Sequence, residues 1–209
     1  MLNNEGFDLW ANDYDRTVQI SSQDDSYPFA GYKEIMNMIF QEIMKKEHAK
    51  ILDIGIGTGV LSTRLYEHGH DIDGIDFSRE MLSIAQPKME DANLIEWNIA
   101  KGLPAEINRN SYDFIISTYT LHHFDDEEKI DILKRLLARL KDNGKILIGD
   151  ISFEDRESHD ACRLDNDRIW DTDEYYFING ELDPDLSSIS NYHYHQISHC
   201  GGLYIIDNL

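Results

Sequence analysis

The sequence has little that would hold the protein together covalently or direct it to a membrane. Only two of its 209 residues are cysteines, Cys162 and Cys200, and their spacing is not that of a CxxC motif. This argues against a disulfide scaffold and favours a reducing compartment. Residues 1–15 lack the regions of a signal peptide, and no apolar run reaches the roughly 20 residues that a membrane-spanning helix needs. We expect a cytoplasmic protein with no membrane partner.

Positive charge is also scarce. The chain carries 19 Lys and Arg residues against 40 Asp and Glu residues, and its formal net charge is -21. A surface of this kind repels the phosphate backbone of nucleic acids. Even the densest basic stretch, residues 134–141, is a mixed helical pattern with acidic neighbours. We therefore expect no nucleic-acid partner.

What the sequence does contain is a regular alternation of apolar strands and amphipathic helices. Short apolar runs predict strands over 49–55, 71–78, 93–99, 112–120 and 144–151. Helical spacing of apolar residues predicts helices over 31–47, 59–69, 78–89 and 125–143, with weaker helical patterns around 158–170 and 185–199. Strands without strict polar alternation, separated by helices, indicate a parallel sheet covered on both faces. The predicted fold class is α/β, doubly wound.

A glycine loop follows the first of these strands, at Gly55, Gly57 and Gly59. Glycines permit positive φ and close approach of the backbone to a ligand, and ligands of such sheets bind at the carboxyl ends of the strands. A phosphate-binding P-loop needs Lys and Ser or Thr after its last glycine, but Val60 follows here. A dinucleotide loop has the spacing GxGxxG, and a carboxylate such as Asp53 would repel its pyrophosphate. The loop favours a ligand with an amino group or other positive charge.

The segment ILDIGIGTG resembles the first motif, (D/E)xGxGxG, of class I S-adenosylmethionine-dependent methyltransferases. GIDFSREML, SYDFIISTYTLHHF and LARLKDNGKILIGD are similar to later motifs of that family and follow in the same order, over roughly residues 8–153. The opening WANDYD is similar to small-molecule members, particularly the bacterial YrrT-like group. The resemblance implies a Rossmann-like sheet, S-adenosylmethionine as cofactor and S-adenosylhomocysteine as product.

The resemblance also implies roles for residues along the cofactor. Gly55 and Gly57 would lie against its methionine moiety, and Asp53 would help to position its amino group. Asp76 would accept hydrogen bonds from both ribose hydroxyls, while Ser78 caps the following helix.

Four further residues would surround the adenine. Phe77 and Met81 would flank it, and Asn98 and Ile99 would border it from the next loop. The family usually has Asp where this chain has Asn98, but either side chain offers an oxygen to the adenine amino group.

The methyl end of the cofactor would face Thr118 and Tyr119, and Tyr14 would reach its carboxylate end. Among possible catalytic residues we choose His123 and Tyr119, with Asp150 as a lesser candidate. The alternative is that the LHHF segment is only a structural turn after the fourth strand.

A metal site is not expected. His195 and His199 have the i, i+4 spacing of helical zinc ligands, but the sequence has no HExxH motif and no complementary cluster. We predict no metal ligands.

The predicted reaction is methyl transfer to an O, N or S nucleophile of a small-molecule acceptor. The (N/D)PPY motif of amino-methylating enzymes is absent after the fourth strand, and neither cysteine lies near it, which argues against base methylation. Two alternatives remain: a nicotinamide-dependent oxidoreductase on the same topology, and a cofactor-binding protein without turnover.

We predict one methyltransferase domain over 1–209. It would comprise an N-terminal helical lid (1–47), a cofactor-binding core (48–153), and a substrate-side segment with a terminal strand (154–209). Family members usually end in two antiparallel strands, and only 201–209 is recognisable as one. The sheet is therefore expected to lack its last strand or to place this one atypically at its edge. An exposed edge invites pairing, so the protein is expected to be a monomer or a homodimer.

Overall fold

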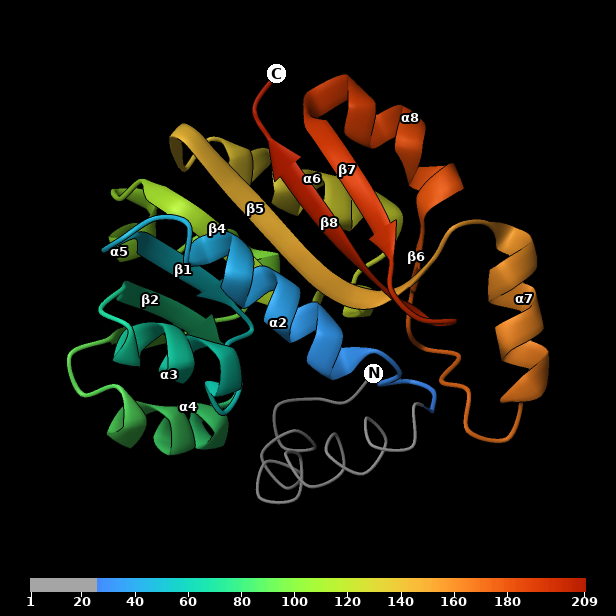
Figure 1. Ribbon diagram of the computed structural model, residues 1–209, viewed down its shortest axis with the longest axis horizontal. Coiled ribbons are helices and arrows are strands. Elements are labelled where there is room, and N and C mark those ends of the chain that lie inside the picture. The colour runs from blue at the N-terminus through green and yellow to red at the C-terminus, as the bar shows by residue number, and fades with distance from the viewer. Residues whose placement is uncertain (1–25) are drawn as a thin grey trace.

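The computed structural model describes residues 26–209, which form one mixed sheet with helices packed against it (Figure 1). The strands run in the order β3-β2-β1-β4-β5-β8-β7, and β6 pairs with the end of β5. β1 to β5 pair in parallel, as the buried apolar runs predicted. The strands are β1 Lys50–Ile54, β2 Asp71–Asp76, β3 Asn93–Glu96, β4 Tyr112–Thr118, β5 Leu140–Phe153, β6 Phe177–Ile178, β7 Asn191–Gln196 and β8 Gly201–Asp207.

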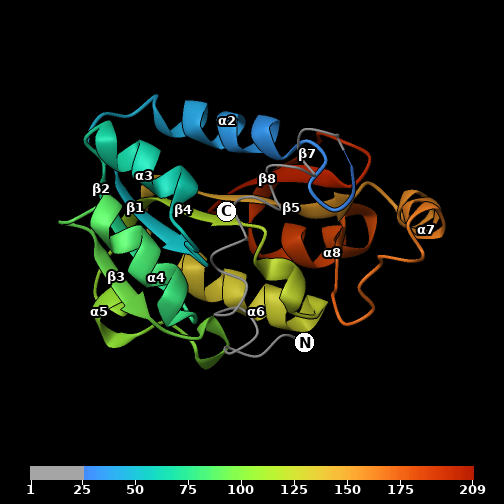
Figure 2. The same ribbon diagram turned by 90° about the horizontal axis from the view of Figure 1, so that it is seen from below.

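Helices cover both faces of the sheet. The α-helices are α2 Tyr32–Ile43, α3 Val60–Glu67, α4 Arg79–Ala85, α5 Ala105–Asn108, α6 Asp126–Leu137, α7 Arg156–Asp165 and α8 Asn179–Ile189. Three 3-10 turns are η1 Gln86–Lys88, η2 Ile99–Lys101 and η3 Leu121–His123. The apolar residues of α2, α3 and α4 join one core cluster, and those of α5, α6 and α8 join another. Figure 2 shows α2 and α3 on one side of the sheet and α6 and α8 on the other. The doubly wound α/β prediction is confirmed.

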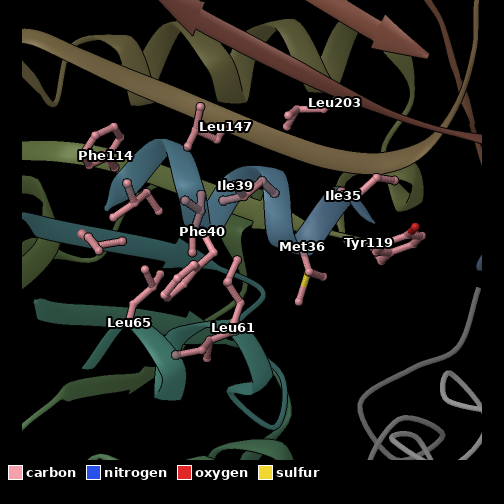
Figure 3. Packing of buried hydrophobic residues seen from close by; sticks show 14 of the residues in the cluster. Ile35, Met36, Ile39, Phe40, Leu61, Leu65, Phe114, Tyr119, Leu147 and Leu203 are labelled. Carbon is pink, nitrogen blue, oxygen red and sulfur yellow. The ribbon is translucent and has the colours of Figure 1, made fainter. Parts of the chain in front are cut away.

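Helix α2 packs directly on the centre of the sheet. A Cβ atom at Gly149 of β5 would lie 2.3 Å from Cγ2 of Ile35, so the absence of a side chain there lets the helix approach. Figure 3 shows Ile35 and Ile39 of α2 beside Leu147 and Leu203, which belong to β5 and β8. This contact fixes the N-terminal turns of α2 at the carboxyl ends of the strands.

The prediction that the last strand is missing was wrong. β8 is antiparallel to β5 and lies between β5 and β7, and β7 is antiparallel to β8. The second strand therefore precedes 201–209 in the chain instead of following it. It lies in 185–199, where we expected a helix, and the structure has the end of α8 followed by β7. His195 is in β7 and His199 is in the turn after it, so they do not share a helix face.

The boundary between α6 and β5 also differs from the prediction. The helix was expected to continue to residue 143, but it ends at Leu137 and β5 begins at Leu140. The pairing of β5 with β4 shifts register between Tyr112 and Phe114. At Gly144 a Cβ atom would lie 2.9 Å from the carbonyl oxygen of Tyr112. This glycine therefore allows close approach of the two strands.

Within residues 26–209 no helix is long and apolar enough to cross a membrane. Tyr14 and most of the predicted lid lie outside the described residues. The division of the chain into lid, core and substrate-side segment stays a prediction.

Candidate active site

The glycine loop between β1 and α3 has the backbone conformation expected from its sequence. Gly55, Gly57 and Gly59 have φ values of 71°, 56° and 76°, in the left-handed region that favours glycine. A Cβ atom at Gly55 would lie only 2.2 Å from Oγ1 of Thr120, so this position is closed by the loop after β4. At Gly57 a Cβ atom would meet nothing nearer than the carbonyl oxygen of Gly55 at 4.0 Å. The loop is therefore packed on one side and open on the other.

Asp76, the last residue of β2, is held by the backbone on both carboxylate oxygens. Oδ2 accepts a hydrogen bond of 2.8 Å from the amide of Gly57, and Oδ1 accepts one of 2.8 Å from the amide of Ser78. Ser78 caps α4 by accepting from the amide of Met81, as predicted. These contacts fix a buried carboxylate between the glycine loop and the start of α4.

Asp53 near the end of β1 is buried with an incomplete set of partners. Its Oδ2 accepts a 2.6 Å hydrogen bond from the hydroxyl of Ser62, whereas Oδ1 has no hydrogen-bond partner among the described residues. Burial, and then the charge of Asp76, raise the pKa of Asp53 from 3.8 to about 7. A buried oxygen without a donor is costly unless a ligand supplies one.

One cavity of about 270 Å³ brings most of the predicted site together. The predicted residues in its lining are Asp53, Gly55, Gly57, Asp76, Phe77, Met81, Thr118, Tyr119 and His123. Asn98 and Ile99 are not part of the lining. Oδ1 of Asn98 accepts a hydrogen bond from the amide of Ala100 and caps η2, and the side chain of Ile99 is buried in a core cluster. Their assignment to the adenine stays a prediction.

His122 is at the centre of a charged cluster at one end of this cavity. Its Nδ1 lies 2.6 Å from Oδ1 of Asp150, and its Nε2 lies 3.5 Å from Oε1 of Glu174. Burial alone would lower the pKa of His122, but the two carboxylates overcome it and raise the pKa to about 10. Asp150 is in turn fixed by the amides of Leu121 and Ile151, at 3.0 and 2.8 Å from its oxygens. The LHHF segment is thus a structured turn that also presents histidines to the cavity.

His123 has the opposite protonation preference. Its Nδ1 lies 3.7 Å from Oε1 of Glu174, and its ring lies 4.2 Å from that of His122. Burial, and then the charge of His122, lower the pKa of His123 to about 4. Near neutral pH the two adjacent histidines therefore differ in charge.

Aromatic rings close the cavity between α2 and the loop after β4. The rings of Phe29 and Tyr32 have centroids 5.3 and 5.2 Å from that of Tyr119. Tyr119 has a φ of 51°, unusual for a residue with a side chain, and its amide donates to the carbonyl of Gly149 at 2.9 Å. Sequence reasoning missed Phe29, Tyr32 and Glu174, because no local pattern connects these segments to the glycine loop.

The raised pKa of Asp53 leads to a pH-dependent stability. Between pH 4 and 7 the carboxyl group of Asp53 binds more protons in the folded state than in the unfolded state, so its contribution to stability is fully present below pH 4 and is lost as the pH rises to 7. The expected contribution is about 4 kcal/mol. In the ligand-free protein, Asp53→Asn should remove it, so the variant gains stability relative to the native protein as the pH rises. Urea denaturation of both proteins from pH 4 to 8 measures the difference, and parallel pH curves would contradict the assignment.

Comparison with known proteins agrees with this geometry. A family model described as a methyltransferase domain matches residues 51–144. An uncharacterized methyltransferase of Bacillus cytotoxicus is 36% identical over 156 residues, which cover 74% of this chain and 69% of the relative. Another, of Alkaliphilus oremlandii, is 33% identical over 154 residues, with the same coverage.

Solved structures share the fold at low sequence identity. The DhpI-SAM-HEP complex superimposes with a TM-score of 0.71 at 14% identity, over 97% of this chain and 94% of that one. Magnesium protoporphyrin IX methyltransferase of Synechocystis PCC 6803, with bound SAH, gives a TM-score of 0.66 at 15% identity, over 85% and 84%. This chain belongs to the class I S-adenosylmethionine-dependent methyltransferases. Its cofactor is S-adenosylmethionine, and the narrower likeness to the YrrT-like group stays a prediction.

Proposed function

We propose that this protein transfers the methyl group of S-adenosylmethionine to an O, N or S nucleophile of a small molecule. The observation that carries the proposal is one cavity in which most of the predicted cofactor residues lie together with the cluster of His122, His123 and Glu174. An acceptor must enter this concave site to meet the donor, which favours a small molecule over a folded macromolecule. The net charge of -21 also disfavours nucleic acid.

The cofactor end of the cavity fits a nucleoside that carries an amino-acid tail. Oδ1 of Asp53 is a buried acceptor that an amino group could satisfy. The open side of Gly57 allows a ligand to approach bare backbone. The carboxylate of Asp76 is held in place by two amides and can accept further hydrogen bonds from hydroxyl groups. These features support the predicted roles of the three residues.

The bound cofactor supplies a methyl group on a sulfonium, which is already an activated electrophile. The remaining work of the protein is to align the acceptor and to exclude water. The rings of Phe29, Tyr32 and Tyr119 form an apolar wall suited to both tasks. Because the pKa of His123 is lowered to about 4, its ring has an unprotonated nitrogen near neutral pH. We propose that this nitrogen accepts the proton of the acceptor's nucleophile.

This role predicts a selective kinetic defect. His123→Ala should lower kcat by about 100-fold, the lower end of what proton transfer contributes, and should leave the affinity for S-adenosylhomocysteine within about twofold. His195→Ala, on the exposed face of β7, is the control and should change neither quantity. Formation of S-adenosylhomocysteine, followed by mass spectrometry with a panel of small hydroxyl, amine and thiol compounds, gives the rate.

The same panel tests the function itself. Methyl transfer to a compound on the panel supports the proposal. Tight binding of S-adenosylhomocysteine with no turnover of any compound would favour a cofactor-binding protein without activity. Thermal stabilisation by NADH but not by S-adenosylhomocysteine would instead favour the oxidoreductase alternative.

A further inference from the structure

Three side chains that bind metals in other proteins converge at the acceptor end of the cavity. They are His122 and His123, from η3 after β4, and Glu174, from the segment before β6. One ligand atom from each lies within 4.8 Å of the other two. Within residues 26–209 this is the one group of His, Cys, Asp and Glu side chains with such a spacing. Histidines adjacent in sequence gave no helical metal-binding pattern, and Glu174 is 51 residues further along the chain, so the sequence did not predict this site.

The distances between the ligand atoms suit a single ion. Oε1 of Glu174 is 3.5 Å from Nε2 of His122 and 3.7 Å from Nδ1 of His123. In a tetrahedral site with bonds of 2.0–2.1 Å, neighbouring ligand atoms are about 3.4 Å apart. The two distances to Glu174 are close to this spacing, and an ion at this position would replace the proton that His122 carries on Nε2.

Asp150 gives the cluster a second feature of metal sites. Its Oδ1 forms a 2.6 Å hydrogen bond with Nδ1 of His122, so the other ring nitrogen, Nε2, points to Glu174. Metal-binding histidines usually direct their second nitrogen to a carboxylate or carbonyl in this way, which fixes the ring and raises its basicity. Asp150 is completely buried and is bound to two backbone amides, so it is a rigid support.

The cluster is also accessible and incomplete. All three ligand side chains line the cavity, and His123 and Glu174 retain 23% and 19% of their side-chain exposure. Two imidazoles and one carboxylate occupy three positions of a divalent ion, and a site with three protein ligands leaves a position for water or substrate. That position would face the same space as Tyr119 and Thr120.

We propose that His122, His123 and Glu174 bind a divalent first-row transition ion, with Asp150 as the positioning residue behind His122. The ion would hold an acceptor through an oxygen, nitrogen or sulfur donor group. This role for the acceptor rests on the proposed methyl transfer, whereas the ion site itself does not. In the metal-loaded protein His123 serves the acceptor as a ligand of the ion and not as a direct proton acceptor.

Cobalt(II) is a suitable probe, because its visible absorption reports coordination by protein ligands. The full chain, treated with a chelator and dialysed, is titrated with CoCl2 in the absence of cofactor and acceptor. The expected result is about one ion per chain with a visible band, displaced by ZnCl2. Glu174→Gln and His123→Ala should each weaken binding by more than about 100-fold, and Asp150→Asn by about 10- to 100-fold. The double variant His193→Ala/His195→Ala removes two exposed histidines of β7 and should bind as the native protein does.

One control measurement and one further variant separate the possible causes of lost cobalt binding. Circular dichroism of each variant shows whether it is folded. Glu174→Gln keeps the size of the side chain, and residue 174 belongs to neither core cluster. Asp76→Ala should lose S-adenosylhomocysteine and keep cobalt, which separates a failure of the metal site from a failure of the proposed function. Binding of less than about 0.1 ion per chain, or equal cobalt affinity in Glu174→Gln and the native protein, would overturn the proposal and leave the cluster as a hydrogen-bonded ion pair.

Discussion

Asp76→Ala is expected to reduce the affinity for S-adenosylhomocysteine by at least about 100-fold. The carboxylate at the end of β2 is buried and accepts hydrogen bonds from the amides of Gly57 and Ser78. Alanine would remove the proposed acceptor of the ribose hydroxyls and also loosen the glycine loop. Hydrogen bonds to a charged group contribute about 1.5–3 kcal/mol each. Loss of the bonds to two ribose hydroxyls should therefore cost at least about 3 kcal/mol of binding free energy, which corresponds to about 100-fold in affinity. Isothermal titration calorimetry measures it directly.

Asp71→Ala is the matched control for this experiment. Asp71 is the first residue of the same strand, at the end of β2 opposite to Asp76. Its exposed carboxylate lies 3.3 Å from the ammonium group of Lys50. Its removal should leave the affinity for S-adenosylhomocysteine unchanged, because an exposed ion pair of this kind contributes about 1 kcal/mol or less. If both variants bind S-adenosylhomocysteine as tightly as the native protein, the ribose assignment of Asp76 is wrong.

Gly55→Ala is expected to destabilise the fold by about 2–5 kcal/mol. The new Cβ atom would lie 2.2 Å from Oγ1 of Thr120 and within 2.8 Å of two of its carbon atoms. Overpacking typically costs about 1–3 kcal/mol, and occasionally more. The left-handed backbone at φ 71° adds about 1–2 kcal/mol for a residue with a Cβ atom. Urea denaturation at a fixed pH gives the free energy of unfolding.

Gly57→Ala provides the contrast, because its Cβ atom would enter open space. Only the backbone cost of about 1–2 kcal/mol is expected for the free energy of unfolding. The affinity for S-adenosylhomocysteine should nevertheless fall by more than about 10-fold, since the methyl group occupies the side of the loop that the cofactor is proposed to approach. Equal stability losses in the two variants, or native affinity in Gly57→Ala, would contradict this division between a packing glycine and a binding glycine.

The cofactor side of the molecule could be predicted from sequence because its signals are local. Asp53, Gly55, Gly57 and Asp76 lie in two strand-to-loop segments that keep the same spacing to their strands, and the structure brings them together as expected. The parallel sheet follows from five apolar runs separated by helices. No such local rule connects the acceptor side, and Glu174 reaches the histidines only through the path of the chain before β6.

The error over residues 185–199 has a specific physical origin. The segment NYHYHQ alternates between tyrosine and polar residues, which is the period of a strand with one face covered. Tyr192 and Tyr194 pack on Tyr204 of β8, with ring centroids 6.1 and 4.5 Å apart, while His193 and His195 are exposed. We gave more weight to a weak helical periodicity over 185–199 than to this alternation. The edge strand was therefore interpreted as a helix.

The anchoring of η3 by Asp150 has a consequence for changing what the enzyme accepts. One carboxylate of strand β5 holds both the backbone of Leu121 and the ring of His122, so this wall of the cavity is attached directly to the sheet. Other parts of the lining come from residues 27–32 and 169–174, which belong to no strand. Substitutions in these two short segments should therefore change which acceptor binds while leaving the residues proposed to bind the cofactor unchanged.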